Sequence, residues 1–76
     1  MPTLLVVDGF RFFFYANDHA PPHVHVIKGE RWAKIEVESG SVVVSTLKRQ
    51  ELKACLMLTE QHREQFLEQW YGWFNR

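Results

Sequence analysis

Cysteine, glycine and proline are scarce in this 76-residue sequence, which has one cysteine, four glycines and three prolines. The single cysteine, Cys55, excludes an internal disulfide. It also argues against a structural zinc site, because such sites usually contain several cysteine thiolates. Since Cys55 lies in a helical pattern, we expect it to be a small buried apolar group rather than a nucleophile.

An excess of charge and a long hydrophobic run are also missing. Lys plus Arg and Asp plus Glu number nine each, so no overall basic field attracts nucleic acid, and RNA is a candidate partner only through a local basic patch. The run LLVV ends after four residues at Asp8. It is too short for a membrane span, and no basic signal-peptide segment precedes it. We therefore expect a cytoplasmic protein with no membrane partner.

Hydrophobic residues, in contrast, are abundant. They make up 46% of the chain, and aromatic residues make up 14%. We expect residues 1–76 to form a single domain, and a domain this short buries only about 60% of the surface of its unfolded chain. Part of the apolar surface is therefore expected to form an interface, with a second copy in a homodimer or with a small partner protein.

Two β-hairpins are predicted in the first half of the chain. Residues 3–7 and 10–16 flank Asp8-Gly9, a dipeptide typical of a type I′ turn, which pairs Val7 with Phe10, Leu5 with Phe12 and Leu4 with Phe13. Residues 23–28 and 31–37 flank Gly29-Glu30, which suits a type II′ turn. The second register pairs residues 27, 26, 25, 24 and 23 with residues 32, 33, 34, 35 and 36. A turn at 39–41 and a short fifth strand at 42–45 follow.

The second half of the chain has the period of a helix. The stripe that recurs at three- and four-residue steps consists of Leu52, Leu56, Thr59, Arg63, Phe66, Trp70 and Phe74. Ser45 or Thr46 is expected to cap its start. No proline or glycine interrupts residues 47–71, which favours one helix over two. The predicted fold is α+β: an antiparallel sheet of four to five strands, made of two hairpins plus a short strand, packed on one long C-terminal helix.

Side-chain alternation sorts the strand residues into two faces. The apolar face, which we expect the helix to cover, is centred on Phe10, Phe12, Phe14, Val24, Val26 and Ile35. The opposite face mixes aromatic and ionisable residues: Arg11, Phe13, Tyr15, His23, His25, Trp32, Lys34 and Glu36. Exposed aromatic rings among ionisable groups are typical of a contact surface, so we expect function on this second face, with Phe13 and Trp32 more exposed than Phe12 and Ile35.

Three histidines crowd the stretch NDHAPPHVHV at residues 17–26. His23 and His25 are two apart in a strand, so their rings point to one side and can converge on zinc or nickel. His19 and Asp18, on the preceding loop, are candidates to complete such a site. A divalent metal is thus a candidate cofactor, although no metal ligand is firmly assigned. His62, on the helix, is expected to be a boundary residue rather than a further ligand.

The same histidines allow three other interpretations. His19, His23 or His25 can act in acid-base catalysis, for example in a small phosphodiesterase or ribonuclease in which Lys34 and Arg11 hold the phosphate near Tyr15. They can belong to a binding surface without chemistry, for which the candidate residues are Asn17, Asp18, Phe13, Trp32, Tyr71 and Trp73. They can also be half-buried strand residues with structural hydrogen bonds. Whether the protein is an enzyme therefore stays open.

Four aromatic residues crowd the end of the predicted helix: Trp70, Tyr71, Trp73 and Phe74. At 100° per residue they span more than half of the helix circumference. Trp70 and Phe74 are expected to face the core, whereas Tyr71 and Trp73 point away from it. We expect this end to contribute to self-association or partner binding, unless Trp73 folds back over a strand.

The pattern R-F-x-F-Y-x-N-D-H-x-P-P-H-V-H resembles a family of small bacterial and archaeal proteins classed as a domain of unknown function. The positions that match it are Arg11, Phe12, Phe14, Tyr15, Asn17, Asp18, His19, Pro21, Pro22, His23 and His25, and the family's late tryptophan corresponds to Trp70. The resemblance implies a small ββββα domain. It also implies a gene that often lies beside one for a second small domain, as in a toxin–antitoxin pair. Family members often have an acidic, proline-containing stretch where this chain has SGSVVVS, so the path of residues 39–47 stays open.

Overall fold

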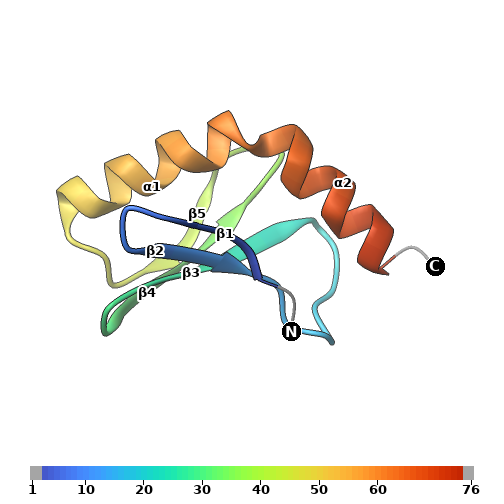
Figure 1. The fold of residues 1–76 in the computed structure, drawn as a ribbon, viewed down its shortest axis with the longest axis horizontal. Helices are drawn as coiled ribbons and strands as arrows, with labels where there is room; N and C mark the ends of the chain where they lie inside the picture. The colour runs from blue at the N-terminus through green and yellow to red at the C-terminus, as the bar shows by residue number, and fades with distance from the viewer. Residues whose placement is uncertain (1–2, 75–76) are drawn as a thin grey trace.

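A computed structural model describes residues 3–74 as one antiparallel sheet with two helices on one side of it (Figure 1). The five strands lie in chain order across the sheet. They are β1 (Thr3–Val7), β2 (Phe10–Phe13), β3 (His23–Lys28), β4 (Arg31–Glu36) and β5 (Val42–Ser45). The helices are α1 (Arg49–Gln61) and α2 (Arg63–Phe74). The predicted α+β fold is confirmed.

The first hairpin has the predicted turn and one irregularity. Asp8 and Gly9 both have positive φ, 51° and 80°, as a type I′ turn requires. The pairs of Val7 with Phe10 and of Leu5 with Phe12 are confirmed. The predicted pair of Leu4 with Phe13 is wrong: Thr3 faces Phe13, because a bulge at Leu4 adds one residue to β1. The bulge turns Leu4 toward the core, where it packs partly buried.

The second hairpin has the predicted register over its whole length, from Ile27 opposite Trp32 to His23 opposite Glu36. Its turn begins at Gly29, whose φ of 62° is in the left-handed region. β5 then pairs with β4, with a register shift between Lys34 and Ile35. Residues 39–47 therefore continue the meander at the edge of the sheet.

The prediction of one continuous helix is wrong. The helical segment is interrupted at His62, which separates α1 from α2 (Figure 1). His62 has φ −109° and ψ 17°, and its ring Nδ1 lies 2.9 Å from the carbonyl oxygen of Leu58. Neither proline nor glycine causes this break. The change of direction lets both helices follow the twisted sheet, so that Thr59 of α1 and Phe66 of α2 are both buried.

The start of α1 also differs from the prediction, since the N-cap residue is Lys48 rather than Ser45 or Thr46. The Ser45 hydroxyl accepts a hydrogen bond from the Leu47 N–H, and Thr46 Oγ1 accepts one from the Trp32 N–H. Both side chains therefore hold the β5–α1 connection and not the first helical turn. The Lys48 N–H donates to Glu51 at 2.9 Å instead.

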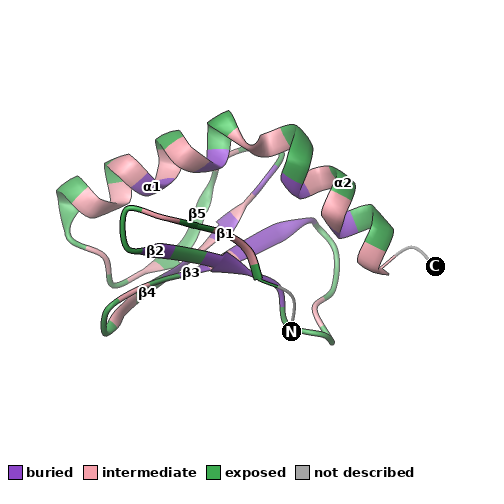
Figure 2. Ribbon diagram, viewed as in Figure 1, coloured by how far each residue is buried: buried purple, intermediate pink, exposed green. Residues whose placement is uncertain are grey.

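The core lies between the helices and one face of the sheet (Figure 2). It contains the predicted apolar face and the buried helix residues, namely Phe10, Phe12, Phe14, Val24, Val26, Ala33, Ile35, Val37, Cys55, Phe66 and Trp70. Rings of strand and helix meet directly, since the centroids of Phe12 and Phe66 are 5.4 Å apart. The face assignment from alternation is therefore confirmed. Cys55 is buried as expected, and burial raises the pKa of its thiol to about 11.

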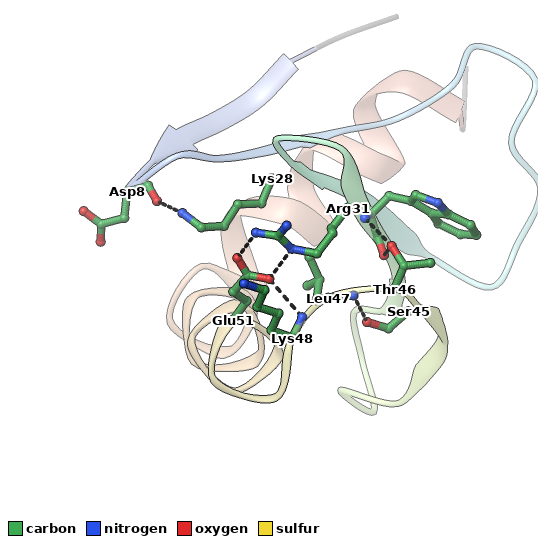
Figure 3. A network of polar contacts seen from close by, with 9 residues as sticks. Asp8, Lys28, Arg31, Ser45, Thr46, Leu47, Lys48 and Glu51 are labelled. Atoms are coloured by element: carbon green, nitrogen blue, oxygen red, sulfur yellow. Dashed lines mark hydrogen bonds and ion pairs between the residues drawn. The ribbon is translucent and has the colours of Figure 1, made fainter.

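A polar network fastens the end of the second hairpin to α1 (Figure 3). The Arg31 guanidinium donates two hydrogen bonds to the Glu51 carboxylate, from Nε at 2.6 Å and from a terminal nitrogen at 2.5 Å. Lys28 Nζ donates to the carbonyl oxygen of Asp8 at 2.8 Å, which links the two hairpin turns. Within residues 3–74, neither helix combines the length and the hydropathy that crossing a bilayer requires.

Candidate functional site

The sheet face opposite the helices carries the mixed set of side chains that alternation predicts. We call it the outer face, and it consists of Val6, Arg11, Phe13, Tyr15, His23, His25, Ile27, Trp32, Lys34, Glu36 and Val44. The helices lie on the other side of the sheet (Figure 1), and α2 reaches the outer face only at its His23 end, through the side chain of Trp70. Trp32 is 45% exposed, whereas Ile35 on the core side is fully buried.

Phe13 is buried on the outer face, by other side chains of that face. Only 2% of it is exposed, against 0% for Phe12, so the predicted order holds by a small margin. The His25 ring stacks on Phe13 at 5.5 Å, and Tyr15 meets it edge-on at 5.2 Å. The Arg11 guanidinium lies 5.4 Å from the ring centroid. Phe13 therefore supports this surface from beneath and offers little exposed area of its own, and its role as a binding residue stays a prediction.

The outer face is hollowed beside Trp32. A cavity of about 520 Å³ is lined by Phe13, Tyr15, His25, Ile27, Arg31 and Trp32, among others. Tyr15 and Trp32 are each 45% exposed. Exposed aromatic rings around a concave surface, with an arginine at its border, are the composition that protein interfaces favour.

The loop between β2 and β3 brings Asp18 to one end of this face. Its carboxylate accepts a hydrogen bond from the Tyr15 N–H at 2.9 Å, and its own N–H donates to the Tyr15 carbonyl at 3.2 Å. The bond between the Asp18 N–H and the Tyr15 carbonyl closes a four-residue β-turn over residues 15–18. The loop then passes through a cis Ala20–Pro21 bond. The Pro22 carbonyl accepts a hydrogen bond from Val37 N–H, which fixes the loop to the chain after β4.

Asp18, His23 and His25 form a compact cluster, in which one candidate ligand atom of each residue lies within 4.8 Å of the others. The Asp18 carboxylate lies between the two rings, 3.2 Å from His23 Nε2 and 3.1 Å from His25 Nε2. The side chains are only 11%, 5% and 18% exposed, respectively. The prediction from their spacing that the rings of His23 and His25 point to the same side of the sheet is thus confirmed.

Burial, hydrogen bonds and neighbouring charges together set the protonation preferences of the cluster. Burial lowers the pKa of His25 and outweighs the opposing hydrogen bond and charge of Asp18. Burial also acts to raise the pKa of Asp18. The Tyr15 N–H, the hydrogen bond and charge of His25 and the charge of His23 together outweigh it and hold that pKa below its usual range. Near neutral pH, Asp18 is therefore a carboxylate and His25 is mainly a neutral imidazole.

Other predicted site residues lie around the cluster. His19 is exposed and does not belong to it, so Asp18, and not His19, is the third member. Asn17 and His19 line a cavity of about 380 Å³ beside the cluster, together with Lys34 and Glu36. Lys34 lies opposite His25 in the register, as predicted. His62 caps α1 and stacks on Phe66, consistent with a boundary role.

The aromatic end of α2 is only partly exposed. Trp70 is buried and Phe74 packs against the core, as predicted. Tyr71 is 49% exposed, whereas Trp73 is half-buried and lines a small cavity with Leu4 and other residues. The role of Tyr71 and Trp73 in an interface stays a prediction.

Two contacts of His23 could not be predicted from the sequence. The Trp70 ring packs on His23, with centroids 5.0 Å apart, and so connects the helix layer to the cluster. The carbonyl oxygen of Pro21 lies 2.9 Å from His23 Nδ1 and orients the ring. Contacts of a backbone carbonyl and of a distant aromatic ring depend on the loop path, which residue types alone do not define.

Comparison with known proteins places the chain in a family. No curated protein and no solved structure matches it. A family model matches residues 9–71, which contain the whole cluster and most of the outer face. The chain therefore belongs to the family described as Domain of unknown function (DUF4160).

Proposed function

We propose that this protein is a binding module whose outer face docks a small partner protein. The observation that carries the proposal is that this sheet face, which lies on the side away from the helices, exposes aromatic and aliphatic side chains beside cations. Trp32 and Tyr15 are each 45% exposed and Val6 is 66% exposed. Apolar surface of this kind gains free energy when a partner removes it from water, at about 25 cal/mol per Å² of apolar area.

The composition of the face favours a protein partner over nucleic acid. Glu36 lies on the face with Lys34, and the whole chain has equal numbers of acidic and basic residues. A nucleic-acid surface is usually dominated by cations. The partner we propose is the product of a neighbouring gene, as in the two-gene, toxin–antitoxin-like arrangement that the family resemblance implies.

Catalysis by the histidines is less well supported. A ribonuclease would need one of the candidate histidines, His19, His23 or His25, to exchange protons with a substrate, and for His25 the geometry is unfavourable. In this structure the His25 Nε2 faces both Asp18 oxygens at 3.1 Å. RNA cleavage therefore stays a prediction from the sequence, and the geometry adds nothing to it.

Co-expression with the neighbouring gene product tests the proposal. We expect the two proteins to co-purify, and Trp32→Ala to weaken the complex by tenfold or more, because interface tryptophans are frequent hot spots. Met57→Ala is the matched control, since Met57 is a large hydrophobic residue, 56% exposed on α1. We expect it to bind like the unmodified protein.

Three outcomes would contradict the proposal. The first is the absence of a complex. The second is a complex that Met57→Ala weakens as much as Trp32→Ala does. The third is a homodimer, detected by light scattering, that Trp32→Ala converts to a monomer. The last result would assign the outer face to a second copy of the chain.

A further inference from the structure

We infer that Asp18, His23 and His25 form a binding site for one divalent metal ion of the zinc class. Imidazole nitrogen and carboxylate oxygen are the donors that such ions take in sites with two histidines and one acid. The inference goes beyond the proposed function, because it concerns a buried cluster and needs no partner protein.

The ring of His23 supplies the first argument. Its Nδ1 lies 2.9 Å from the Pro21 carbonyl oxygen, which can only accept a hydrogen bond, so Nδ1 carries a proton. In the neutral ring, Nε2 then presents a lone pair. It lies 3.2 Å from Asp18 Oδ1, which is also an acceptor, and it has no hydrogen-bond partner although it is buried. Two acceptors at this distance require a positive centre between them, either a second proton or a metal ion.

The spacing of the donor atoms supplies the second argument. Zinc binds histidine nitrogen at about 2.0–2.1 Å, so two ligands of a tetrahedral ion lie roughly 3.3 Å apart. The Asp18 carboxylate is 3.2 Å from His23 Nε2 and 3.1 Å from His25 Nε2. Both distances to Asp18 are thus already close to the spacing of two zinc ligands, and the two histidine nitrogens lie within 4.8 Å of each other.

The surroundings of the cluster orient its donors as metal sites require. A ligating histidine usually donates its other ring N–H to a backbone carbonyl, and a ligating carboxylate accepts a further hydrogen bond. Pro21 and the Tyr15 N–H have these two roles here. The adjacent cavity of about 380 Å³ provides an entry path and leaves a coordination position for water or an external ligand.

Zinc titration of untagged, chelator-treated protein tests the inference. We expect one Zn²⁺ per chain by calorimetry, and no comparable binding of Mg²⁺, which prefers oxygen donors. Asp18→Asn keeps an oxygen that can accept from the Tyr15 N–H but loses the charged ligand. We expect it to weaken Zn²⁺ binding by roughly 100-fold or more, at or above the upper range for loss of an outer-shell partner. His25→Gln, on a regular strand, provides a second variant if Asp18→Asn fails to fold.

His19→Ala and His62→Ala are the matched controls, because both remove a histidine outside the cluster. We expect each to bind Zn²⁺ within about threefold of the unmodified protein. Equal weakening by His19→Ala and by Asp18→Asn would contradict the site as assigned.

Nitrogen-15 NMR of the imidazole rings distinguishes the metal from a proton. With Zn²⁺ bound, we expect His23 to keep its proton on Nδ1 and to show a metal-bound Nε2. If both nitrogens of His23 stay protonated when Zn²⁺ is in excess, the cluster is an ion pair with Asp18 and the inference is wrong. These measurements use the isolated protein and need no partner. A negative zinc result would therefore leave the partner proposal standing, and the absence of a partner complex would leave the zinc site standing.

Discussion

At the residue scale, the loop between β2 and β3 shows which parts of a site a sequence pattern can predict and which it cannot. The alternation of His23 and His25 predicts that their rings share a side, because strand geometry is local. The choice between Asp18 and His19 as third member is not local. It depends on the turn in which the Asp18 carboxylate accepts the Tyr15 N–H, which points that side chain inward and leaves His19 exposed.

The Arg31–Glu51 pair leads to a pH prediction. Its bidentate contact, together with the Lys48 N–H, lowers the pKa of Glu51 to about 2 from 4.5. A lowered pKa in the folded state adds stability above pH 4.5, and this stability is lost as the pH falls toward 2. We expect Glu51→Gln to lower the melting temperature at pH 7, and the difference from the unmodified protein to shrink between pH 4.5 and pH 2.

Thermal unfolding at several pH values and salt concentrations measures this effect. High salt is expected to reduce it, since the pair lies near the surface. Glu68→Gln, at an exposed position of α2, is the control. A loss of stability for Glu51→Gln that stays constant down to pH 2 would contradict the assigned cause.

Cys55 leads to a second prediction at this scale. Its thiol is buried, and its pKa of about 11 leaves little thiolate at neutral pH. We expect a thiol reagent to label the native protein far more slowly than the unfolded protein. Fast labelling under native conditions, measured by mass spectrometry, would show that α1 leaves the sheet readily.

At the element scale, turns were more predictable than helix continuity. The dipeptide Asp8-Gly9 determines its hairpin because few residues tolerate two consecutive positive φ angles. The break at His62 has no such marker. It arises from the fit of two helices to a twisted sheet, which is a tertiary effect, and the helical stripe continues through it.

Glycine substitutions test the element-scale argument. Gly9→Ala places a side chain on a backbone with a φ of 80°, which residues other than glycine rarely adopt, so we expect a loss of about 1–2 kcal/mol in unfolding free energy. The new Cβ also lies 2.8 Å from Lys28 Nζ, but that flexible end can move away at small cost. Gly72→Ala lies in α2, where a Cβ meets nothing within 4 Å. It is expected to be neutral or to stabilise by up to about 1 kcal/mol. Denaturant titration of both variants measures this, and equal effects would contradict the assigned turn.

The attachment of α2 to the sheet gives a further prediction. Phe66 is fully buried against Phe12, and replacing a buried phenylalanine with alanine usually costs about 3–5 kcal/mol. We expect Phe66→Ala to lower the unfolding free energy by that amount. Met57→Ala, which is exposed on α1, is expected to change it by less than about 0.5 kcal/mol. Similar losses in the two variants would mean that α2 is not part of the cooperative core.

At the scale of the whole molecule, the sequence predicted the two faces of the sheet and the side that the helices cover. That success follows from a period of two in the strands and from an apolar set that coincides across β2, β3 and β4. The burial of Phe13 was not fully predictable, because it depends on His25 and Tyr15 closing over the ring. On the outer face, Phe13 is thus buried beneath the side chains of His25 and Tyr15.

The central claim is that the outer face, and not the helix face, receives the partner. Fluorine NMR of protein labelled with fluorotryptophan tests it directly, because Trp32 lies on the outer face and Trp70 lies in the core. With a soluble paramagnetic agent, we expect the Trp32 signal, assigned through Trp32→Phe, to broaden in the free protein and to be protected once the neighbouring gene product binds. A Trp32 signal that remains equally broadened in the complex would contradict the account.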